Sequence, residues 1–156
     1  MDLDLDQQLQ ILIDQAPQDG TMPQIMAQAI APVLKTIAQQ LEHQEYYVCQ
    51  SAAGDWLMTT LAHREHHPQE TKTVIYCFVN LTLAQQYQGG NLGSGLTAVP
   101  LPVTHILFQL FALGQVDSLI FVETQGKRIE IQRRDLQRAI QKQLQGDRPQ
   151  AKNQWA

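Results

Sequence analysis

The N-terminal part of the chain repeats its apolar residues with helical spacing. Apolar side chains recur every third or fourth position over residues 5–16, which predicts a short helix that ends before Pro17. A longer apolar face over residues 21–41 predicts the longest helix of the chain. Pro32 lies in its middle and has no N–H to bond the carbonyl of Gln28, so we expect a kink or a break there.

The period of the pattern then shortens to that of β-strands. Glu45–Ser51 and Asp55–Ala62 are predicted to be strands joined by a short glycine-containing loop, which is typical of a hairpin. Thr73–Leu81 is apolar on both faces, so we expect it in the centre of the sheet. Residues 83–88 predict one further helical turn.

The least polar segment runs from Val99 to Glu123. It predicts a buried helix that begins near Pro102 and ends at Gly114, followed by a strand over Ser118–Glu123. A second strand, Lys127–Gln132, makes a tight hairpin with it. The helix and the first of these strands are expected to fill the core.

A closing helix over residues 136–144 completes the order ααβββ(α)αββα. Hairpins dominate this order and no βαβ crossover is required, so we expect an α+β fold with an antiparallel sheet of about five strands flanked by helices. At this length one domain buries roughly 70% of its unfolded surface. We expect that single domain over residues 1–145 and a flexible tail over residues 146–156.

The net charge of −4 hides an asymmetry along the chain. Residues 1–116 hold three basic and ten acidic residues, whereas residues 117–156 hold eight basic and five acidic ones. The basic C-terminal part includes Arg134, Arg138 and Lys142, which are spaced to form one stripe on the closing helix. Such a stripe could contact nucleic-acid phosphates, although acidic residues interrupt it.

Several features favour a cytoplasmic protein. Cys49 and Cys77 lie singly within apolar strands, which is typical of buried, reduced thiols. The acidic N-terminus does not have the pattern of a signal peptide, and the apolar runs are too short to span a bilayer. We therefore expect neither export nor a membrane span.

Histidines are the main candidates for chemistry. His63, His66 and His67 cluster where the second strand ends, and three imidazoles could ligate zinc, nickel or copper. Their spacing matches neither HExxH nor HxxEH and no cysteine is close by, so a solvated loop is the competing interpretation and we expect no metal. His105 lies on the apolar helix, where we expect it to face outward together with Thr104 and Gln109.

Aromatic residues on the first hairpin provide the best binding signal. Tyr46 and Tyr47 point to opposite faces of their strand, and Trp56 and Met58 lie on the facing strand. Aromatic and methionine side chains on an open sheet face can bind a peptide. The competing interpretation places them under the long helix. The candidate partner-binding residues are thus Tyr46, Tyr47, Trp56, Met58, His105 and Gln109.

Two resemblances add to this interpretation. The runs VIYCFVNLTLAQQYQ, VPLPVTHILFQLFALGQVDSLIFVE and GKRIEIQRRDLQRAI follow a strand, helix, strand and hairpin order that resembles SseB-like domains. That resemblance covers the last half of the chain and implies a protein-interaction module. The Asn-Pro often seen near the late strand of those domains is absent from VDSLIFVE, so no functional residue is carried over.

The whole chain also resembles small cyanobacterial accessory and assembly proteins of the CcmS kind. It is rich in glutamine and contains the stretches APQDGTMPQIM and VPLPVTHILFQL, which carry this resemblance. It implies an assembly factor whose partner is a component of the carboxysome shell.

We therefore expect a non-enzymatic protein-interaction module, an adaptor or assembly chaperone that binds a peptide or subunit of a partner and uses no cofactor. Two alternatives remain open. One is a small metal-dependent or hydrolytic enzyme centred on His63, His66, His67 or His105. The other is nucleic-acid binding through the C-terminal basic helix, and a homodimer is compatible with each.

Overall fold

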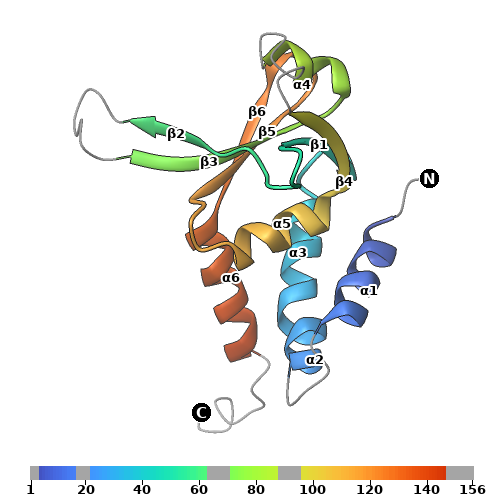
Figure 1. Ribbon diagram of the computed structural model, residues 1–156. Helices are drawn as coiled ribbons and strands as arrows, with labels where there is room; N and C mark the ends of the chain where they lie inside the picture. The colour runs from blue at the N-terminus through green and yellow to red at the C-terminus, as the bar shows by residue number, and fades with distance from the viewer. Residues whose placement is uncertain (1–3, 17–21, 63–70, 88–95, 147–156) are drawn as a thin grey trace, which may run out of the picture.

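A computed structural model of the protein describes residues 4–16, 22–62, 71–87 and 96–146. Six strands form one sheet in the order β4-β1-β3-β5-β6, and β2 pairs with the first half of β3 (Figure 1). The strands are β1 Glu45–Gln50, β2 Thr59–Ala62, β3 Thr71–Phe78, β4 Thr97–Pro102, β5 Ser118–Val122 and β6 Arg128–Gln132.

The helical segments pack around this sheet. They are α1 Leu5–Gln15, α2 Met22–Ile25, the π-helical turn η1 Met26–Ile30, α3 Ala31–Ala38, α4 Leu81–Tyr87, α5 Val103–Ala112, the 3₁₀ turn η3 Thr124–Gly126 and α6 Arg133–Gly146. The predicted α+β class with helices around a mostly antiparallel sheet is confirmed, and the order of elements roughly matches the predicted one. No helix in the described ranges is long and apolar enough to cross a membrane.

The sheet contains one parallel pair of strands, whereas the sequence predicted an antiparallel sheet. β3 and β5 run side by side in the same direction, with Ile75 opposite Leu119 and Cys77 opposite Phe121. The chain between them contains α4, β4 and α5, so it makes a long crossover. All other pairs are antiparallel within the described residues. Both central strands are buried on their two faces, as parallel neighbours usually are.

β4 is the strand that the sequence pattern did not predict. It contains Pro100 and Pro102, and it pairs with β1 along its whole length. The N–H of Val103 donates to the carbonyl of Gln44 at 2.9 Å. The backbone N–H and C=O groups of odd-numbered β4 residues therefore point toward β1, whereas the backbone nitrogens of the two prolines point away from it, to the outer edge. Proline is compatible with such an edge because no ladder hydrogen bond is lost there.

The first predicted hairpin forms its turn and a short antiparallel bridge between Gln50 and Trp56. The N–H of Ser51 donates to the carbonyl of Asp55 at 2.8 Å, and Gly54 adopts a positive φ of 90°. Thr59–Ala62 then leaves β1 and pairs with β3 instead. β1 pairs only with the end of β3, near Cys77 and Phe78. The first half of β3 is therefore left for β2 to pair with.

The long helix changes its winding just before Pro32. Instead of a break, η1 inserts a wider π turn, in which the N–H of Ala31 bonds the carbonyl of Met26. The carbonyl of Gln28, which Pro32 cannot bond, accepts a hydrogen bond of 3.4 Å from the amide of Gln143 on α6. The predicted kink is thus a π turn that also contacts the last helix.

The main core lies between one face of the sheet and helices α1, α3, α5 and α6, which lie below the sheet in Figure 1. Residues of β1, β3 and β5 alternate between this face and the opposite one. The opposite face carries a smaller cluster beneath α4, which includes Phe78 and Ala84. The apolar alternation of the central strands therefore supplies both clusters.

Candidate functional site

Two hollows lie along α5, and together we call them the α5 site. The first, the α1–α5 hollow, has a volume of about 330 Å³ and lies between α1, η1 and α5. Most of its wall is apolar, and its polar groups are neutral. Its lining residues are Leu12, Gln15, Ala16, Met26, Ile30, His105, Phe108, Gln109 and Phe111.

The second, the loop–α5 hollow, has a volume of about 450 Å³. It lies between the turn that follows β1 and the end of α5. Gln109 lines both hollows, so they flank one exposed side chain. The lining residues are Gly54, Asp55, Trp56, Met58, Gln109, Leu113 and Gln115.

The helical period of α5 explains this placement. Ile106, Leu107 and Leu110 face the core and have at most 1% of their surface exposed. Phe108 and Phe111, three residues apart, lie on the flank of that face with their ring centroids 6.3 Å apart, and both are half-buried. The two phenylalanine rings on this flank therefore line the α1–α5 hollow.

Gln8 holds α1 against α5 and shapes the first hollow. Its side chain is buried, and its Oε1 accepts hydrogen bonds from the N–H of Thr104 at 3.1 Å and from the hydroxyl of Thr104 at 2.7 Å. Its Nε2 donates to the carbonyl of Gln44 at 3.0 Å. The expectation that Thr104 faces outward is therefore wrong, because its hydroxyl finds a buried partner that the helical period does not reveal.

His105 lies in the wall of the α1–α5 hollow. Its Nε2 is 3.3 Å from the carbonyl of Gln8, a contact in which the ring nitrogen is the donor and the carbonyl is the acceptor. No hydroxyl, thiol or carboxylate belongs to the described residues that line this hollow. The arrangement therefore offers shape, apolar surface and neutral hydrogen-bonding groups to a bound segment.

The remaining predicted partner residues are divided between several places. Trp56 and Met58 line the loop–α5 hollow, next to Gln109. Tyr46 has no exposed surface, and its hydroxyl donates to Glu123 Oε2 at 2.5 Å. Tyr47 is half-buried on the opposite face of the sheet. The structure thus brings together four of the six residues along α5 and separates the two tyrosines from them.

Other parts of the α5 site were not predicted from the sequence. The floor residues Leu12, Met26 and Phe108 come from three separate helices, and only the apolar face of each helix could be recognised in advance.

The other candidates for chemistry lie elsewhere in the chain. His63, His66 and His67 lie outside the described residues. Burial, followed by the neighbouring Cys49, raises the pKa of Cys77, which disfavours its thiolate as a nucleophile.

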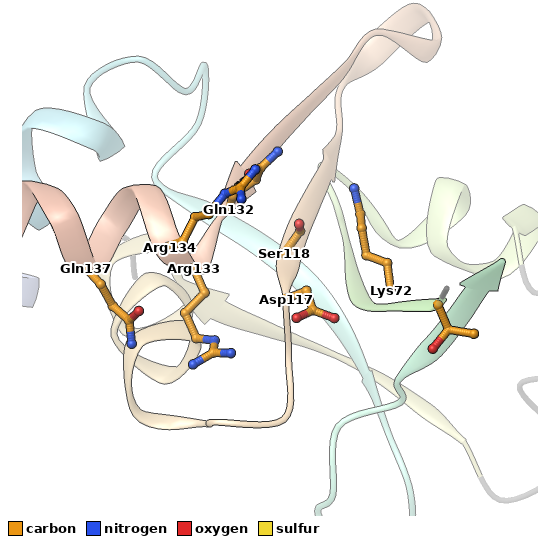
Figure 2. A pocket seen from close by; sticks show the side chains of 8 residues that line it. Lys72, Asp117, Ser118, Gln132, Arg133, Arg134 and Gln137 are labelled. Atoms are coloured by element: carbon orange, nitrogen blue, oxygen red, sulfur yellow. Dashed lines mark hydrogen bonds between the residues drawn. The ribbon is translucent and has the colours of Figure 1, made fainter. Parts of the chain in front are cut away.

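A polar pocket of about 380 Å³ lies at the start of α6 (Figure 2). Figure 2 shows Arg133 and Arg134 extending in different directions there, with Asp117 just before β5 and Lys72 on β3. Its lining residues are Thr71, Lys72, Asp117, Ser118, Gln132, Arg133, Arg134 and Gln137. Three cationic side chains, one carboxylate and the beginning of a helix therefore line this pocket.

Internal contacts engage the charged groups of this pocket. Arg133 Nε donates to the carbonyl of Val116 at 2.8 Å, and Arg134 Nε donates to Gln132 at 3.2 Å. Asp117 accepts from the N–H of Thr73 at 2.8 Å. The pocket therefore connects α6 and β3 to the start of β5, and these contacts support the fold.

Lys72 and Ser118 also bind Glu130 on β6. Partial burial alone would raise the pKa of Glu130, but the hydrogen bonds from Lys72 and Ser118, together with the charge of Lys72, lower it overall.

The predicted basic stripe lies on α6. Its residues Arg134, Arg138 and Lys142 are all exposed, in agreement with the prediction.

Comparison with known proteins gives no relative from which a role could be transferred. No family model matches the chain, and no curated protein matches it significantly.

Proposed function

We propose that this protein is a non-enzymatic interaction module, an adaptor or assembly chaperone that holds an apolar segment of a partner protein in the α5 site. The observation that carries the proposal is the pair of hollows on either side of Gln109. Two adjacent hollows of this size can each receive a large side chain from one bound segment. Interfaces of this kind concentrate their binding energy in such anchors.

The chemistry of the lining defines the partner segment. The α1–α5 hollow has an apolar floor, and its rim carries the neutral polar groups of Gln15, His105 and Gln109. Trp56 and Met58 supply aromatic and thioether surface in the second hollow. An amphipathic segment with two apolar anchors fits this lining, because its polar groups can bond the amides and the imidazole at the rim.

The electrostatics of the site set it apart from a charged interface. Asp55 is the single charged side chain among the described residues that line the two hollows. Binding through this site should therefore depend weakly on salt, whereas binding through the basic stripe would weaken steeply as salt increases.

Affinity capture from the native host with the full chain, followed by mass spectrometry, tests the proposal. The bait is compared with Gln109→Arg, which places a charge between the hollows, and with Met58→Lys in the second hollow. Arg138→Ala on α6 is the matched control, because it changes an exposed residue away from the site. Partners retained by the parent and by Arg138→Ala, but reduced at least about tenfold by the two site variants, support the proposal.

The same capture can refute it. Proteins held equally by the parent, Gln109→Arg and Met58→Lys would show that partners bind elsewhere on the chain. Recovery of the chain itself as its main partner, through the α5 site, would replace the adaptor with a homodimer.

The exposed stripe of Arg134, Arg138 and Lys142 supports nucleic-acid binding as a second candidate function. A gel-shift assay with single- and double-stranded probes tests it. Retardation that weakens with salt and is lost when the three residues become alanine would favour this function. Absence of retardation at low salt would eliminate it.

A further inference from the structure

Glu123 is a buried carboxylate with one oxygen left unsatisfied. It follows β5 and has no exposed surface. Its Oε2 accepts a hydrogen bond from Tyr46, whereas its Oε1 has no hydrogen-bond partner among the described residues. A buried carboxylate oxygen normally has a donor or a cation beside it, because burial without one is strongly unfavourable.

Tyr46 fixes the orientation of this carboxylate. Burial raises the pKa of Tyr46, and the hydrogen bond to Glu123 raises it further, so the phenol keeps its proton and remains a donor. The same hydroxyl accepts from the N–H of His43 at 3.3 Å, and the ring of Phe121 packs against the tyrosine ring with their centroids 4.8 Å apart. With Oε2 held in this way, Oε1 of Glu123 is directed toward His43.

Two further ligand groups face that oxygen. His43 Nε2 lies 3.8 Å from Glu123 Oε1, and one ligand atom each from Glu42, His43 and Glu123 lie within 4.8 Å of one another. Glu42 and His43 are exposed residues of the link between α3 and β1, so small side-chain rotations can bring them onto a shared ion. The cluster thus has one buried ligand, Glu123, and two exposed ligands through which an ion can enter from the solvent.

The charge of the cluster also fits a divalent ion. Glu42 and Glu123 supply two negative charges and the imidazole is a neutral ligand. Lys127, on the turn after β5, binds Glu42 Oε2 at 3.1 Å and leaves the other carboxylate oxygen for a second interaction. A divalent cation would balance the two carboxylates. It would also give a close partner to Glu123 Oε1, which accepts no described hydrogen bond and has His43 Nε2 at 3.8 Å.

We propose that Glu42, His43 and Glu123 form a zinc-binding site, with Tyr46 as the positioning residue that holds Glu123. One imidazole nitrogen and two carboxylate oxygens are ligands that Zn²⁺ accepts. The hydroxyl of Tyr46 donates to Oε2 of Glu123, the carboxylate oxygen that would not bind the metal. Metal-binding carboxylates usually accept such a hydrogen bond from a neighbouring residue. Bound zinc would connect the α3–β1 link to the end of β5.

Zinc titration calorimetry of the full chain, stripped of metal beforehand, tests the site. His63, His66 and His67 could bind zinc by themselves, so every protein in the series carries alanine at these three positions. The variants added to this background are His43→Ala, Glu42→Gln, Glu123→Gln and Tyr46→Phe. His105→Ala is the matched control, since it removes a histidine that lies outside the proposed site.

We expect the background protein and the His105→Ala control to bind one equivalent of Zn²⁺. Tyr46→Phe should weaken binding about 10- to 100-fold, and removal of any of the three ligands should weaken it at least as much. Zinc should also raise the thermal unfolding midpoint of the background but not of His43→Ala. Because Glu42 and His43 are exposed, their variants report on the site even if a change at Glu123 prevents folding.

Three results would overturn the proposal. One is the absence of zinc binding by the background protein. Another is binding that His43→Ala and Glu42→Gln retain at full strength. The third is tight binding of Mg²⁺ or Ca²⁺ without binding of Zn²⁺, which would assign the carboxylates to a different ion.

Discussion

The amide oxygen of Gln8 accepts two hydrogen bonds from Thr104, one from its backbone N–H and one from its hydroxyl. Both residues are buried, and they join α1 to the first turn of α5. The contact satisfies an N–H group that the start of a helix leaves without an internal partner. It also holds the two helices that form the α1–α5 hollow.

Replacing Gln8 with leucine should destabilise the fold. The N–H and the hydroxyl of Thr104 would lose their buried partner, and one unsatisfied group of this kind costs about 1–3 kcal/mol. Urea denaturation of Gln8→Leu, Thr104→Val and the double variant measures the effect. The double variant should lose less than the sum of the single losses, and strict additivity would show that the two side chains are not coupled.

Tyr46→Phe should be destabilising while Tyr47→Phe is nearly neutral. The first change removes the only described hydrogen-bond donor to the carboxylate of Glu123, which stays buried, at a cost of about 1–3 kcal/mol. The second makes the same chemical change on the opposite face of the same strand. Thermal and urea unfolding compare the two variants.

Adding Glu123→Gln to Tyr46→Phe should restore part of the stability, because the buried group then carries no charge. If Tyr46→Phe is as mild as Tyr47→Phe, the hydrogen bond to Glu123 contributes little to the fold.

The lowered pKa of Glu130 predicts a pH-dependent contribution to stability. A depressed pKa in the folded state means that the contribution is present above the ordinary glutamate range and is lost as the pH falls through the folded value. The parent should therefore exceed Glu130→Gln in stability at about pH 7, and the difference should shrink below about pH 4.

Urea midpoints measured across this pH interval test the prediction. Lys72→Met is the control, because it removes the strongest partner of Glu130 and should flatten the pH dependence of the difference. A difference that stays constant or grows with acidification would contradict the assigned direction of the pKa shift.

Pro100→Thr should increase self-association. The prolines of β4 face outward and remove N–H donors from an open edge, and threonine would restore one donor and raise β-propensity. Analytical ultracentrifugation over a range of concentrations measures the effect. Thr97→Val is the control, because it favours the strand without adding an outward donor. Equal association of the two variants would show that the missing donor does not protect this edge.

Periodicity predicted most of the elements because their burial is one-sided. Helices α1, α5 and α6 have apolar faces that a helical repeat reveals, and the apolar run of β3 indicated a central strand. β4 escaped prediction because VPLPV contains two prolines, which normally argue against a strand and are tolerated only at an edge. Position in the sheet is a long-range property that the local pattern does not contain.

The candidate sites were predictable only in part, for the same reason. Trp56, Met58, His105 and Gln109 were chosen for residue type and face, and they line the hollows. Tyr46 has the same local pattern as an exposed aromatic residue, yet it is buried, and its hydroxyl binds Glu123, which lies just after β5 and far along the chain. Among the proposed zinc ligands, Glu123 is likewise far along the chain from the adjacent Glu42 and His43.

The parallel pairing of β3 and β5 has a consequence for the order in which the protein can fold. The turn after β1 and the β5–β6 hairpin close locally and can form early, but β3 gains its second neighbour only after α4, β4 and α5 have been placed. Until then an apolar edge containing Ile75 and Cys77 is open to pairing with other chains. In the finished sheet β6 lies outermost on that side, and its charged Arg128 and Glu130 protect the final edge.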